Sequence, residues 1–335
     1  MMYRALRPLL FRLDPEQAHA LTLRLLSAAH ALGALQRLLP RAVSQPVELL
    51  GLRFPNRVGL AAGFDKNGAC IDALGMLGFG FLELGTVTPK PQPGNPRPRI
   101  FRLPEAQALI NRMGFPNEGV AALCARLPMR RYAGICGVNI GKNAATPLER
   151  AEADYAACLS AVYPHADYVA VNVSSPNTAG LRELQREGQL RALLESLLRL
   201  RSRLATEHGR RVPLLVKLAP DLSEAELAAA AAAIKELHID GVIATNTTLS
   251  RPGLEGLPAA REAGGLSGAP LLSLSTAAVR RLRAQLGAGV AIIGVGGIHS
   301  SESAREMLVA GADLLQVYTG LVYRGPRLVR ELSQA

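Results

Sequence analysis

The sequence has 335 residues. A single α/β barrel typically takes about 250 residues, so one large domain with a small extension fits better than two equal domains. Hydrophobic residues make up 49% of the chain, which excludes extensive disorder and allows a large core. The formal net charge of +11 suits nucleic acid, an anionic membrane or a small acidic ligand, and does not choose among them.

The four cysteines, Cys70, Cys124, Cys136 and Cys158, form no Cys-x-x-Cys pair. This spacing argues against an iron–sulfur cluster and against structural zinc, so we expect no metal. Scattered thiols are typical of reduced, buried cysteines, which fits a protein on the cytosolic side of a membrane.

Residues 1–44 are predicted to be helical, with breaks before Pro15 and near Gly33. This segment is basic, and its apolar residues recur at near-helical spacing. A basic amphipathic helix can lie in the plane of lipid headgroups. Alternatively, the same apolar stripe packs on the barrel, and both interpretations hold if the helices are apolar on two faces. The charged residues are Arg4, Arg7, Arg12, Arg24, Arg37 and Arg41 against Asp14 and Glu16, and the stripe is Ala18, Leu21, Leu25 and Leu26.

Membrane association, if it occurs, is expected at the surface. No stretch reaches the ~18 uninterrupted apolar residues of a spanning helix. Arg12, Asp14 and Glu16 interrupt the first apolar run, which argues against a signal peptide. The sequence therefore predicts a peripheral membrane protein on the cytoplasmic face of the inner (cell) membrane.

From about residue 56 a single unit recurs, in which a short apolar run precedes an amphipathic helix. Runs that are apolar along their whole length suit parallel strands buried on both faces. Eight such units predict a (β/α)8 TIM barrel over residues 45–335, behind an N-terminal helical segment at 1–44. A doubly wound sheet is the alternative, but it would normally have fewer strands. The eight runs are Val58–Ala62, Phe81–Thr86, Ile135–Ile140, Tyr168–Val173, Pro213–Leu218, Gly241–Asn246, Val290–Gly296 and Leu314–Thr319.

Three local signals refine this prediction. Thr146-Pro147-Leu148-Glu149 and Ser223-Glu224-Ala225-Glu226 each have the pattern of a capping box that begins a helix. Residues Leu49 to Phe54 are predicted to form a short hairpin that closes the barrel floor.

Polar residues gather at the carboxyl ends of the predicted strands, where TIM barrels place their chemistry. None of them is a histidine or a carboxylate, although hydrolases usually need a carboxylate, a metal or a histidine base. Amides offer a donor and an acceptor together and suit a planar heterocycle rich in imide groups. The residues are Lys66, Thr86, Asn139, Asn172, Lys217, Thr245 and Asn246, followed by Gly296-Gly297 and Tyr318-Thr319.

The last two strands indicate a phosphate site. Strand seven runs into Gly296-Gly297 with a helix expected near Ser300, and strand eight ends in Tyr318-Thr319-Gly320. Loops in these two positions form the recurrent phosphate cup of the fold. Together with Lys217 on strand five, which could face the N1/O2 edge of an isoalloxazine, they suggest flavin mononucleotide. Alternatively, Lys217 is a structural lysine paired with a carboxylate.

The strongest motif is Asn172-Val173-Ser174-Ser175-Pro176-Asn177-Thr178, directly after strand four. Removing a proton from a carbon next to a carbonyl needs a positioned base, and a serine serves only if a relay carries its proton away. Thr178 is a candidate for that relay. Taken alone, Ser-Ser-Pro-Asn could be only a turn.

At this point the sequence resembles the class 2 dihydroorotate dehydrogenases, from the N-terminus to about Gly325. Class 1 relatives place a cysteine where Ser175 stands and lack the N-terminal helices. The stretches that carry the resemblance are Gly59–Lys66, Gly85–Pro89, Pro91–Asn95, Asn111–Phe115, Ile243–Thr248 and Gly264–Gly268, together with Asn172–Thr178.

The resemblance implies a flavoprotein oxidoreductase of pyrimidine biosynthesis that oxidises dihydroorotate to orotate. In such enzymes the serine, here Ser175, removes the C5 proton, a hydride passes from C6 to flavin N5, and ubiquinone or menaquinone reoxidises the flavin. It further implies proton relay by Thr178 and Phe115, and a quinone head near His19 and Arg102, in a tunnel between the N-terminal helices. FMN would contact Ala62, Gly63, Lys66, Thr86, Asn139, Asn172, Lys217, Thr245, Gly268, Gly297, Tyr318 and Thr319. The pyrimidine would contact Lys66, Asn111, Arg112, Met113, Gly114, Phe115, Asn172, Asn177, Asn246 and Thr247.

Two other classes compete with this interpretation. The positive charge would suit a nucleic-acid binder or a tRNA-modifying flavoenzyme such as a dihydrouridine synthase, but the basic residues are spread along helices and aromatic residues make up only 4%. That family also relies on a catalytic cysteine, where this chain has Ser175. We therefore expect no nucleic-acid partner. A phosphate-binding barrel without catalytic activity is the third alternative.

Overall fold

Eight short parallel strands close into a barrel at the centre of the computed structural model, which describes residues 2–35 and 43–335. Each of the eight predicted runs forms one of these strands, and every barrel strand is buried along all or nearly all of its length because helices cover the outer face. The closed barrel excludes the doubly wound alternative. Its strands, in order around the barrel, are β3 (Val58–Leu60), β4 (Phe81–Val87), β7 (Ile135–Ile140), β8 (Tyr168–Asn172), β9 (Leu214–Leu218), β10 (Gly241–Ala244), β12 (Ala291–Val295) and β13 (Leu314–Val317).

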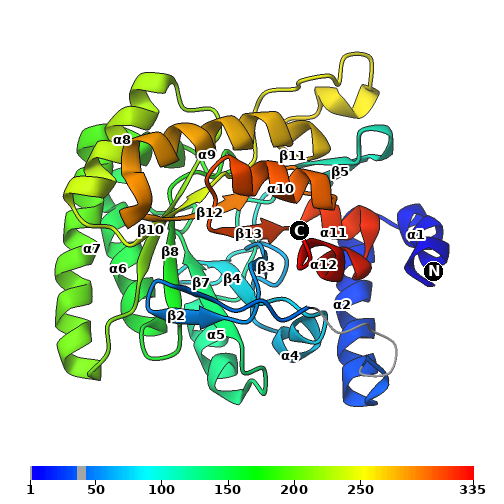
Figure 1. Cartoon of the computed structure of the whole chain (residues 1–335), viewed down its shortest axis with the longest axis horizontal. Coiled ribbons are helices and arrows are strands. Elements are labelled where there is room, and N and C mark those ends of the chain that lie inside the picture. The colour runs from blue at the N-terminus through cyan, green and yellow to red at the C-terminus, as the bar shows by residue number, and fades with distance from the viewer. Residues whose placement is uncertain (1, 36–42) are drawn as a thin grey trace.

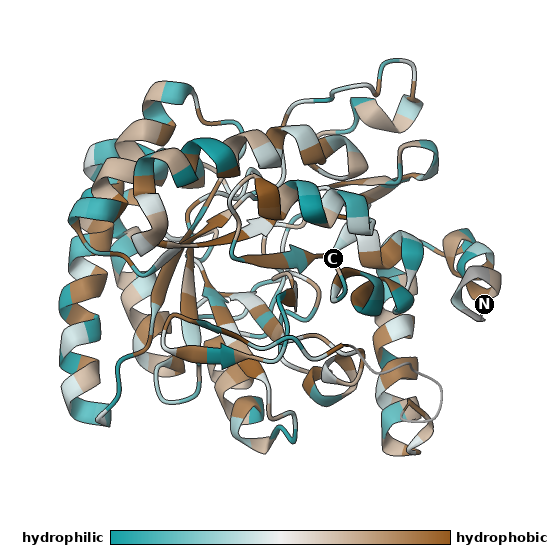
Figure 2. Cartoon of the chain, in the orientation of Figure 1, coloured by the Kyte–Doolittle hydropathy of each residue, from teal (hydrophilic) through white to brown (hydrophobic). Residues whose placement is uncertain are grey.

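The helices form an outer ring around these strands, as Figure 1 shows. In Figure 2 the strands are largely hydrophobic, whereas the outer helices mix hydrophobic and hydrophilic residues. The helices are α4 (Ile71–Gly75), α5 (Val120–Arg126), α6 (Ala151–Val162), α7 (Glu187–His208), α8 (Glu224–Glu236), α9 (Leu272–Leu286), α10 (Ser301–Val309), α11 (Thr319–Arg324) and α12 (Arg327–Leu332). Short 3-10 turns are η1 (Pro104–Ala106), η2 (Leu127–Met129), η3 (Leu148–Arg150), η4 (Leu181–Gln185), η5 (Pro258–Arg261), η6 (Ala269–Leu271) and η7 (Gly287–Gly289).

One predicted capping box is confirmed and the other is wrong. Ser223 Oγ accepts a hydrogen bond from Glu226 N, and the Glu226 carboxylate accepts one from Ser223 N at 2.8 Å, so α8 begins as predicted. Helix α6 begins at Ala151 instead, after the 3-10 turn η3. The turn starts one residue late because Pro147 is extended, with ψ 155°, and caps η3 without a side-chain hydrogen bond. The Thr146 hydroxyl instead donates to the charged Asp154 Oδ2 at 2.7 Å.

The amino ends of the strands are closed by a hairpin, as predicted. Strands β1 (Val47–Leu49) and β2 (Leu52–Phe54) pair antiparallel. Phe54 is fully buried and meets the ring of Phe81 edge-on at 5.3 Å, inside the lower barrel. This aromatic contact fills the floor and leaves the opposite end of the barrel for the site.

A second sheet that the sequence analysis did not predict stands over the carboxyl ends of the strands. It consists of β5 (Ile100–Leu103), β6 (Ala108–Asn111) and β11 (Gly265–Gly268), all antiparallel. A small apolar cluster that includes Leu103, Ile110 and Leu266 holds it together. The sheet adds a wall to the mouth of the barrel.

The N-terminal segment forms two helices, α1 (Met2–Arg12) and α2 (Pro15–Ala31), with the predicted breaks at Asp14 and near Gly33. In Figure 1 they stand at one side of the barrel, beside α11. The predicted apolar stripe divides, because Ala18 is buried and Leu26 packs on the core, whereas Leu25 is 57% exposed. The predicted residues Arg37 and Arg41 lie outside the described residues.

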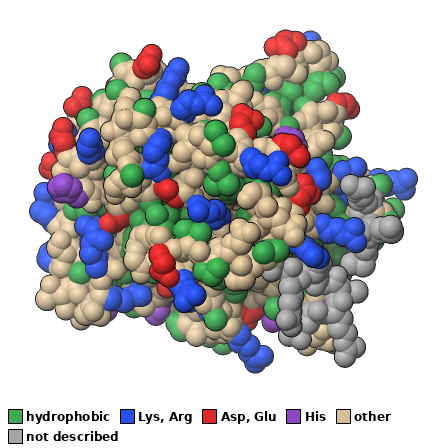
Figure 3. Space-filling model, in the orientation of Figure 1, with side chains coloured by type: hydrophobic (Ala, Val, Ile, Leu, Met, Phe, Trp, Pro, Cys, Tyr) green, Lys and Arg blue, Asp and Glu red, His purple; other side chains and the backbone are tan. Residues whose placement is uncertain are grey.

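Within the described part of the chain, no helix combines the length and the apolar character that crossing a bilayer requires. On the face drawn in Figure 3, Lys and Arg side chains alternate with Asp and Glu and form no continuous basic track.

Candidate active site

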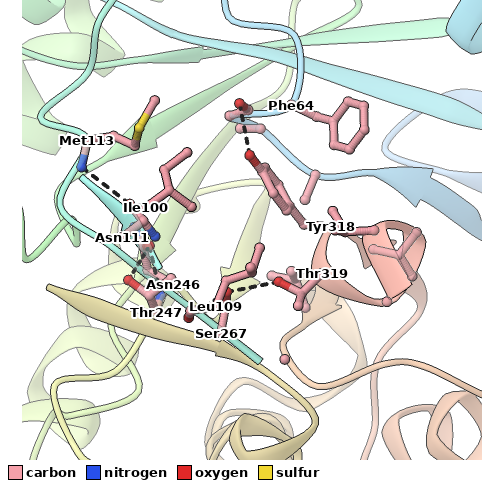
Figure 4. Close-up of a pocket in the computed structure, with 18 of the residues that line it drawn as sticks. Phe64, Ile100, Leu109, Asn111, Met113, Asn246, Thr247, Ser267, Tyr318 and Thr319 are labelled. Carbon is pink, nitrogen blue, oxygen red and sulfur yellow. Dashed lines mark hydrogen bonds between the residues drawn. The ribbon is translucent and has the colours of Figure 1, made fainter. Parts of the chain in front are cut away.

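The main cavity lies at the carboxyl ends of the barrel strands. Barrel loops, the β5–β6–β11 sheet and the two N-terminal helices all contribute to its walls. Figure 4 shows Asn111, Asn246 and Thr247 gathered on one side, with Tyr318 on another. The cavity is lined by every predicted site residue except Asn139, Arg112 and Thr178. The fold therefore brings together residues from His19 to Thr319, which are far apart in the sequence.

A buried carboxylate that the sequence analysis missed lies beneath this cavity. Glu83 points inward from β4 and is fully buried. Its oxygens accept hydrogen bonds from Asn139 Nδ2 at 2.8 Å, Tyr168 OH at 2.9 Å and Gln316 Nε2 at 2.7 Å. Burying a carboxylate is costly unless it is paired and hydrogen-bonded, so these partners stabilise it. The available signal was a single acidic residue within the otherwise apolar run of β4.

Glu83 fixes the direction of a chain of side-chain amides. Because a carboxylate only accepts, Asn139 turns its Nδ2 toward Glu83 and its Oδ1 toward the cavity. That Oδ1 accepts from Thr86 Oγ1 at 2.6 Å and from Asn172 Nδ2 at 3.1 Å. Asn172 Oδ1 then accepts from Asn246 Nδ2 at 3.3 Å. Asn139 thus supports the site from below. This series of hydrogen bonds determines which amide oxygens and nitrogens of Asn172 and Asn246 remain available to a ligand.

Lys217 is the cation at the centre of the site. Its Nζ lies 3.9 Å from Glu83 Oε1, and both side chains are nearly or fully buried. Burial lowers the pKa of Lys217, and the Glu83 carboxylate opposes that shift. The alternative interpretation, in which Lys217 pairs with a carboxylate, is therefore confirmed. It does not exclude a contact with a ligand, because Lys217 also lines the cavity. Among the described residues it makes no hydrogen bond, which leaves its donors for a ligand.

Lys66 and His19 face each other near the N-terminal helices. Lys66 Nζ donates to Gly63 O at 2.6 Å, and removal from water lowers the pKa of Lys66 to about 8. His19 Nε2 donates to Phe64 O at 2.8 Å. Burial, and then the nearby charge of Lys66, lowers the pKa of His19 to about 4, so this imidazole is neutral at pH 7.

Ser175 lies in the loop after β8 and is 5% exposed. Its Oγ accepts a hydrogen bond from Asn177 N at 3.2 Å, which orients the hydroxyl toward the cavity that it lines. Thr178 Oγ1 is buried and has no hydrogen-bond partner within the described residues. A buried hydroxyl of this kind normally binds an ordered water, which is what a proton relay requires.

Glycines shape the opposite wall, where the phosphate site was predicted. Gly297 has φ +78°, and a Cβ there would lie 2.4 Å from Leu272 N, so no other residue fits. Gly268 has φ +102°, and a Cβ there would lie 2.3 Å from Gln107 O. Ser267 and Thr319, whose hydroxyls are 2.8 Å apart, also line this wall. Ser267 was missed, although it lies inside the glycine-rich stretch that the sequence analysis singled out.

Two predicted arginines have separate structural roles. Arg102 lines the cavity, donates to Leu13 O at 2.8 Å and to Phe11 O at 3.1 Å, and stacks over the Phe11 ring. It therefore holds the end of α1. Arg112 is paired with Glu262 at 2.7 Å and does not line the cavity. Within the described residues, no group of three His, Cys, Asp or Glu side chains could hold a metal ion.

The residues present fit a flavin. The buried cation Lys217 lines the cavity, and neither it nor Gln316 Oε1 has a hydrogen-bond partner among the described residues. Glycine loops form another wall. Fold and site together define a TIM-barrel oxidoreductase of the flavin-using class.

Comparison with known proteins gives the family. The family model for dihydroorotate dehydrogenase matches residues 45–335. The chain is 58% identical to the dihydroorotate dehydrogenase (quinone) of Azotobacter vinelandii, over 100% of this chain and 96% of that one. It is 57% identical to that of Leptothrix cholodnii, over 99% and 98%. A crystal structure of the Eimeria tenella enzyme in complex with ferulenol matches with a TM-score of 0.87 and 38% identity, covering 96% of this chain and 90% of that one. The chain belongs to the dihydroorotate dehydrogenase family, in its quinone-dependent class 2.

Proposed function

We propose that this chain oxidises dihydroorotate to orotate in pyrimidine biosynthesis and passes the electrons through FMN to a membrane quinone. The observation that carries the proposal is that a serine hydroxyl, a buried lysine and a chain of amides meet in one cavity at the barrel mouth. The amides match the imide groups of a pyrimidine, and the names of the relatives given above agree with this substrate and acceptor.

The cofactor would lie between the glycine wall and Lys217. Gly268, Gly297, Tyr318 and Thr319 offer backbone and hydroxyl groups to a phosphate, and Lys217 offers its ammonium to the ring edge. Bound flavin supplies the two-electron acceptor chemistry that no side chain of the protein can supply. The remaining proposed flavin contacts are Ala62, Gly63, Lys66, Thr86, Asn172 and Thr245. Asn139 would act on the flavin only through Thr86 and Asn172, because it does not line the cavity.

Release of the cofactor by heat and its analysis by mass spectrometry would test this assignment. We expect FMN at close to one equivalent per chain. Release of FAD, or protein that cannot be loaded with FMN, would contradict the proposed cofactor.

The chain's own residues would bind the pyrimidine and remove its proton. Ser175 would take the C5 proton, oriented by the hydrogen bond from Asn177 N. Thr178, whose hydroxyl has no hydrogen-bond partner in the part of the chain that the structure describes, would hold the water that carries the proton away, and Phe115, which lines the cavity, would enclose that water. The pyrimidine would be held by Lys66, Asn111, Met113, Gly114, Phe115, Asn172, Asn177, Asn246 and Thr247. Arg112 would act on it only through its neighbours, because its side chain is turned toward Glu262.

Orotate binding should weaken at alkaline pH. Orotate is an anion, and Lys66 binds it most strongly while protonated. Because the pKa of Lys66 is about 8, the affinity should be constant at lower pH and fall as pH rises through this value. Above it the Kd should rise by up to about tenfold per pH unit, the slope of a single titrating group.

Titration of the flavin spectrum with orotate between about pH 6 and pH 10 measures this. Lys66→Met should bind more weakly with a flat profile over this range. A flat profile in the unmodified enzyme would contradict the role of Lys66.

The N-terminal helices would give the quinone access from the membrane. His19 and Arg102 line the cavity where α1 and α2 meet the barrel. Leucines of the two helices are exposed, among them Leu9 at 58% and Leu25 at 57%. Arg12 and Arg24, also exposed, are placed to meet anionic headgroups. We propose that the N-terminal segment, residues 1–44, is a unit attached to the barrel at 45–335, and that its helices α1 and α2 rest on the cytoplasmic face of the cell membrane.

The double variant Leu9→Glu, Leu25→Glu should lose most binding to anionic phospholipid vesicles, because two charges would enter the proposed lipid contact. Sedimentation with vesicles measures this. A soluble short-chain quinone should still be reduced at the normal rate, since neither leucine lines the cavity.

Val309→Glu is a matched control. Val309 is 87% exposed on α10, away from the N-terminal helices, and its replacement should leave vesicle binding unchanged. Equal vesicle binding by the double variant and the unmodified protein would contradict the proposed membrane surface.

A further inference from the structure

Arg182 and Asp221 form an ion pair behind the active site. Their side chains are 2.7 Å apart and each is 21% exposed. Arg182 lies on η4, Asp221 lies in the loop after β9, and neither lines the cavity. A partly exposed ion pair contributes little to stability by itself, so the role of this pair depends on its other hydrogen-bond partners.

The guanidinium of Arg182 binds the two loops that carry the proposed chemistry. Its Nε donates to Ser174 O at 3.1 Å, directly before the proposed base. Its second terminal nitrogen donates to Thr247 O at 2.8 Å, within the loop that offers its amide and hydroxyl to the pyrimidine. A planar guanidinium holds several acceptors in fixed geometry, which a lysine ammonium cannot do.

Asp221 completes the junction from the third loop. Its carboxylate accepts from the Thr248 hydroxyl and from Leu249 N, the latter at 3.1 Å. Thr248 in turn pairs through its backbone with Leu266 of β11. The loops after β8, β9 and β10 and the upper sheet thus meet at one ion pair.

We propose that Arg182 and Asp221 are positioning residues, which hold Ser175 at the correct place relative to a pyrimidine bound by Asn246 and Thr247. This inference rests on the proposed function. It concerns only the step in which dihydroorotate reduces the flavin, because within the described chain the hydrogen bonds of Arg182 and Asp221 reach only each other and the loops after β8 and β10. Misplacement of reacting groups by about 1 Å can cost on the order of 100-fold in rate.

Arg182→Met should keep the fold, because Leu181 and Leu184 of η4 stay buried and Gln185 still accepts from Ala219 N. At saturating dihydroorotate, the rate of flavin reduction should fall by about 10- to 100-fold. Flavin content and the rate of reoxidation by quinone should stay within about twofold. Asp221→Asn should act in the same direction, and Arg182→Lys should recover only a small part of the rate.

A matched control exists at the opposite end of the barrel. Arg283 donates to Gly311 O at 2.9 Å and to Val290 O at 3.1 Å, and it pairs with Asp313 at 2.6 Å. The Arg283 side chain is 22% exposed, against 21% for Arg182. Unlike Arg182, it binds residues at the amino ends of the strands, far from the cavity. Arg283→Met should lower the Tm about as much as Arg182→Met and leave both half-reactions unchanged.

Stopped-flow measurement of the two half-reactions, flavin reduction by dihydroorotate and flavin reoxidation by quinone, tests this inference. A slow reductive step with normal reoxidation supports the inference. Normal reduction in Arg182→Met, or an equal loss in both half-reactions together with flavin loss, would overturn it while leaving the proposed function intact. Failure of dihydroorotate to reduce even the unmodified enzyme would overturn both.

Discussion

Ser175→Ala should lose between about 100-fold and 10,000-fold of its rate of flavin reduction by dihydroorotate, the usual contribution of a positioned base. The flavin should remain bound, because Ser175 lines the cavity opposite the glycine wall and only its hydroxyl is removed. Anaerobic mixing in a stopped-flow instrument measures the rate, and the absorbance of the protein before mixing measures flavin content.

Ser175→Cys provides the matched comparison. A thiol fits the same space and becomes a base as it ionises, with an ordinary pKa of about 8.5. Its rate should exceed that of Ser175→Ala and should rise with pH toward that value. If Ser175→Ala reduces its flavin at the normal rate, another group takes the proton and the proposed mechanism is wrong.

Lys217→Met should combine two losses that are separable by experiment. Hydrogen bonds to a charged group contribute about 1.5–3 kcal/mol, so flavin affinity should fall on the order of 10- to 100-fold. The change also leaves Glu83 buried without its cation, 3.9 Å away in the unmodified protein. Breaking a buried pair in this way costs about 3–5 kcal/mol of unfolding free energy.

The double variant Lys217→Met, Glu83→Gln separates the two losses. It removes both charges. The Gln oxygen can still accept from Asn139 Nδ2, and the Gln amide nitrogen can donate to the Tyr168 oxygen, so part of the stability should return. Flavin affinity should stay low, because the cation that faces the ring is still missing. Denaturant unfolding of the apoprotein and flavin titration measure the two quantities. Recovery of flavin affinity in the double variant would mean that Lys217 serves only to neutralise Glu83.

The barrel was predictable because its strands are buried on both faces, and such strands appear in the sequence as uninterrupted apolar runs. The carboxyl ends of the strands and the loops after them line the cavity, so the position of Asn172, Lys217 and Asn246 in the sequence was enough to predict that they lie together there. The antiparallel sheet was not predictable, because β5 and β6 are short and their partner β11 lies about 150 residues away, where Gly265 pairs with Asn111. The β5–β6 hairpin is local but has only four residues in each strand, and its pairing with the distant β11 leaves no pattern in the sequence.

Other features depended on contacts that no local pattern contains. Thr146 has the sequence of a helix cap, but its hydroxyl donates to Asp154 in the first turn of α6. Glu83 has the sequence of an ordinary strand residue, and only the closed barrel brings Tyr168 and Gln316 to it. Arg182 finds Asp221 across 39 positions of sequence. The hydrogen-bond and ion-pair partners of these side chains therefore could not be predicted from the sequence.

The most direct test of the central claim is to add dihydroorotate to the oxygen-free, yellow enzyme and follow its colour. We predict that the yellow colour fades as an equal amount of orotate forms, and that a quinone then restores it. Colour that persists under excess dihydroorotate, in protein shown to carry its full load of flavin, would contradict the account.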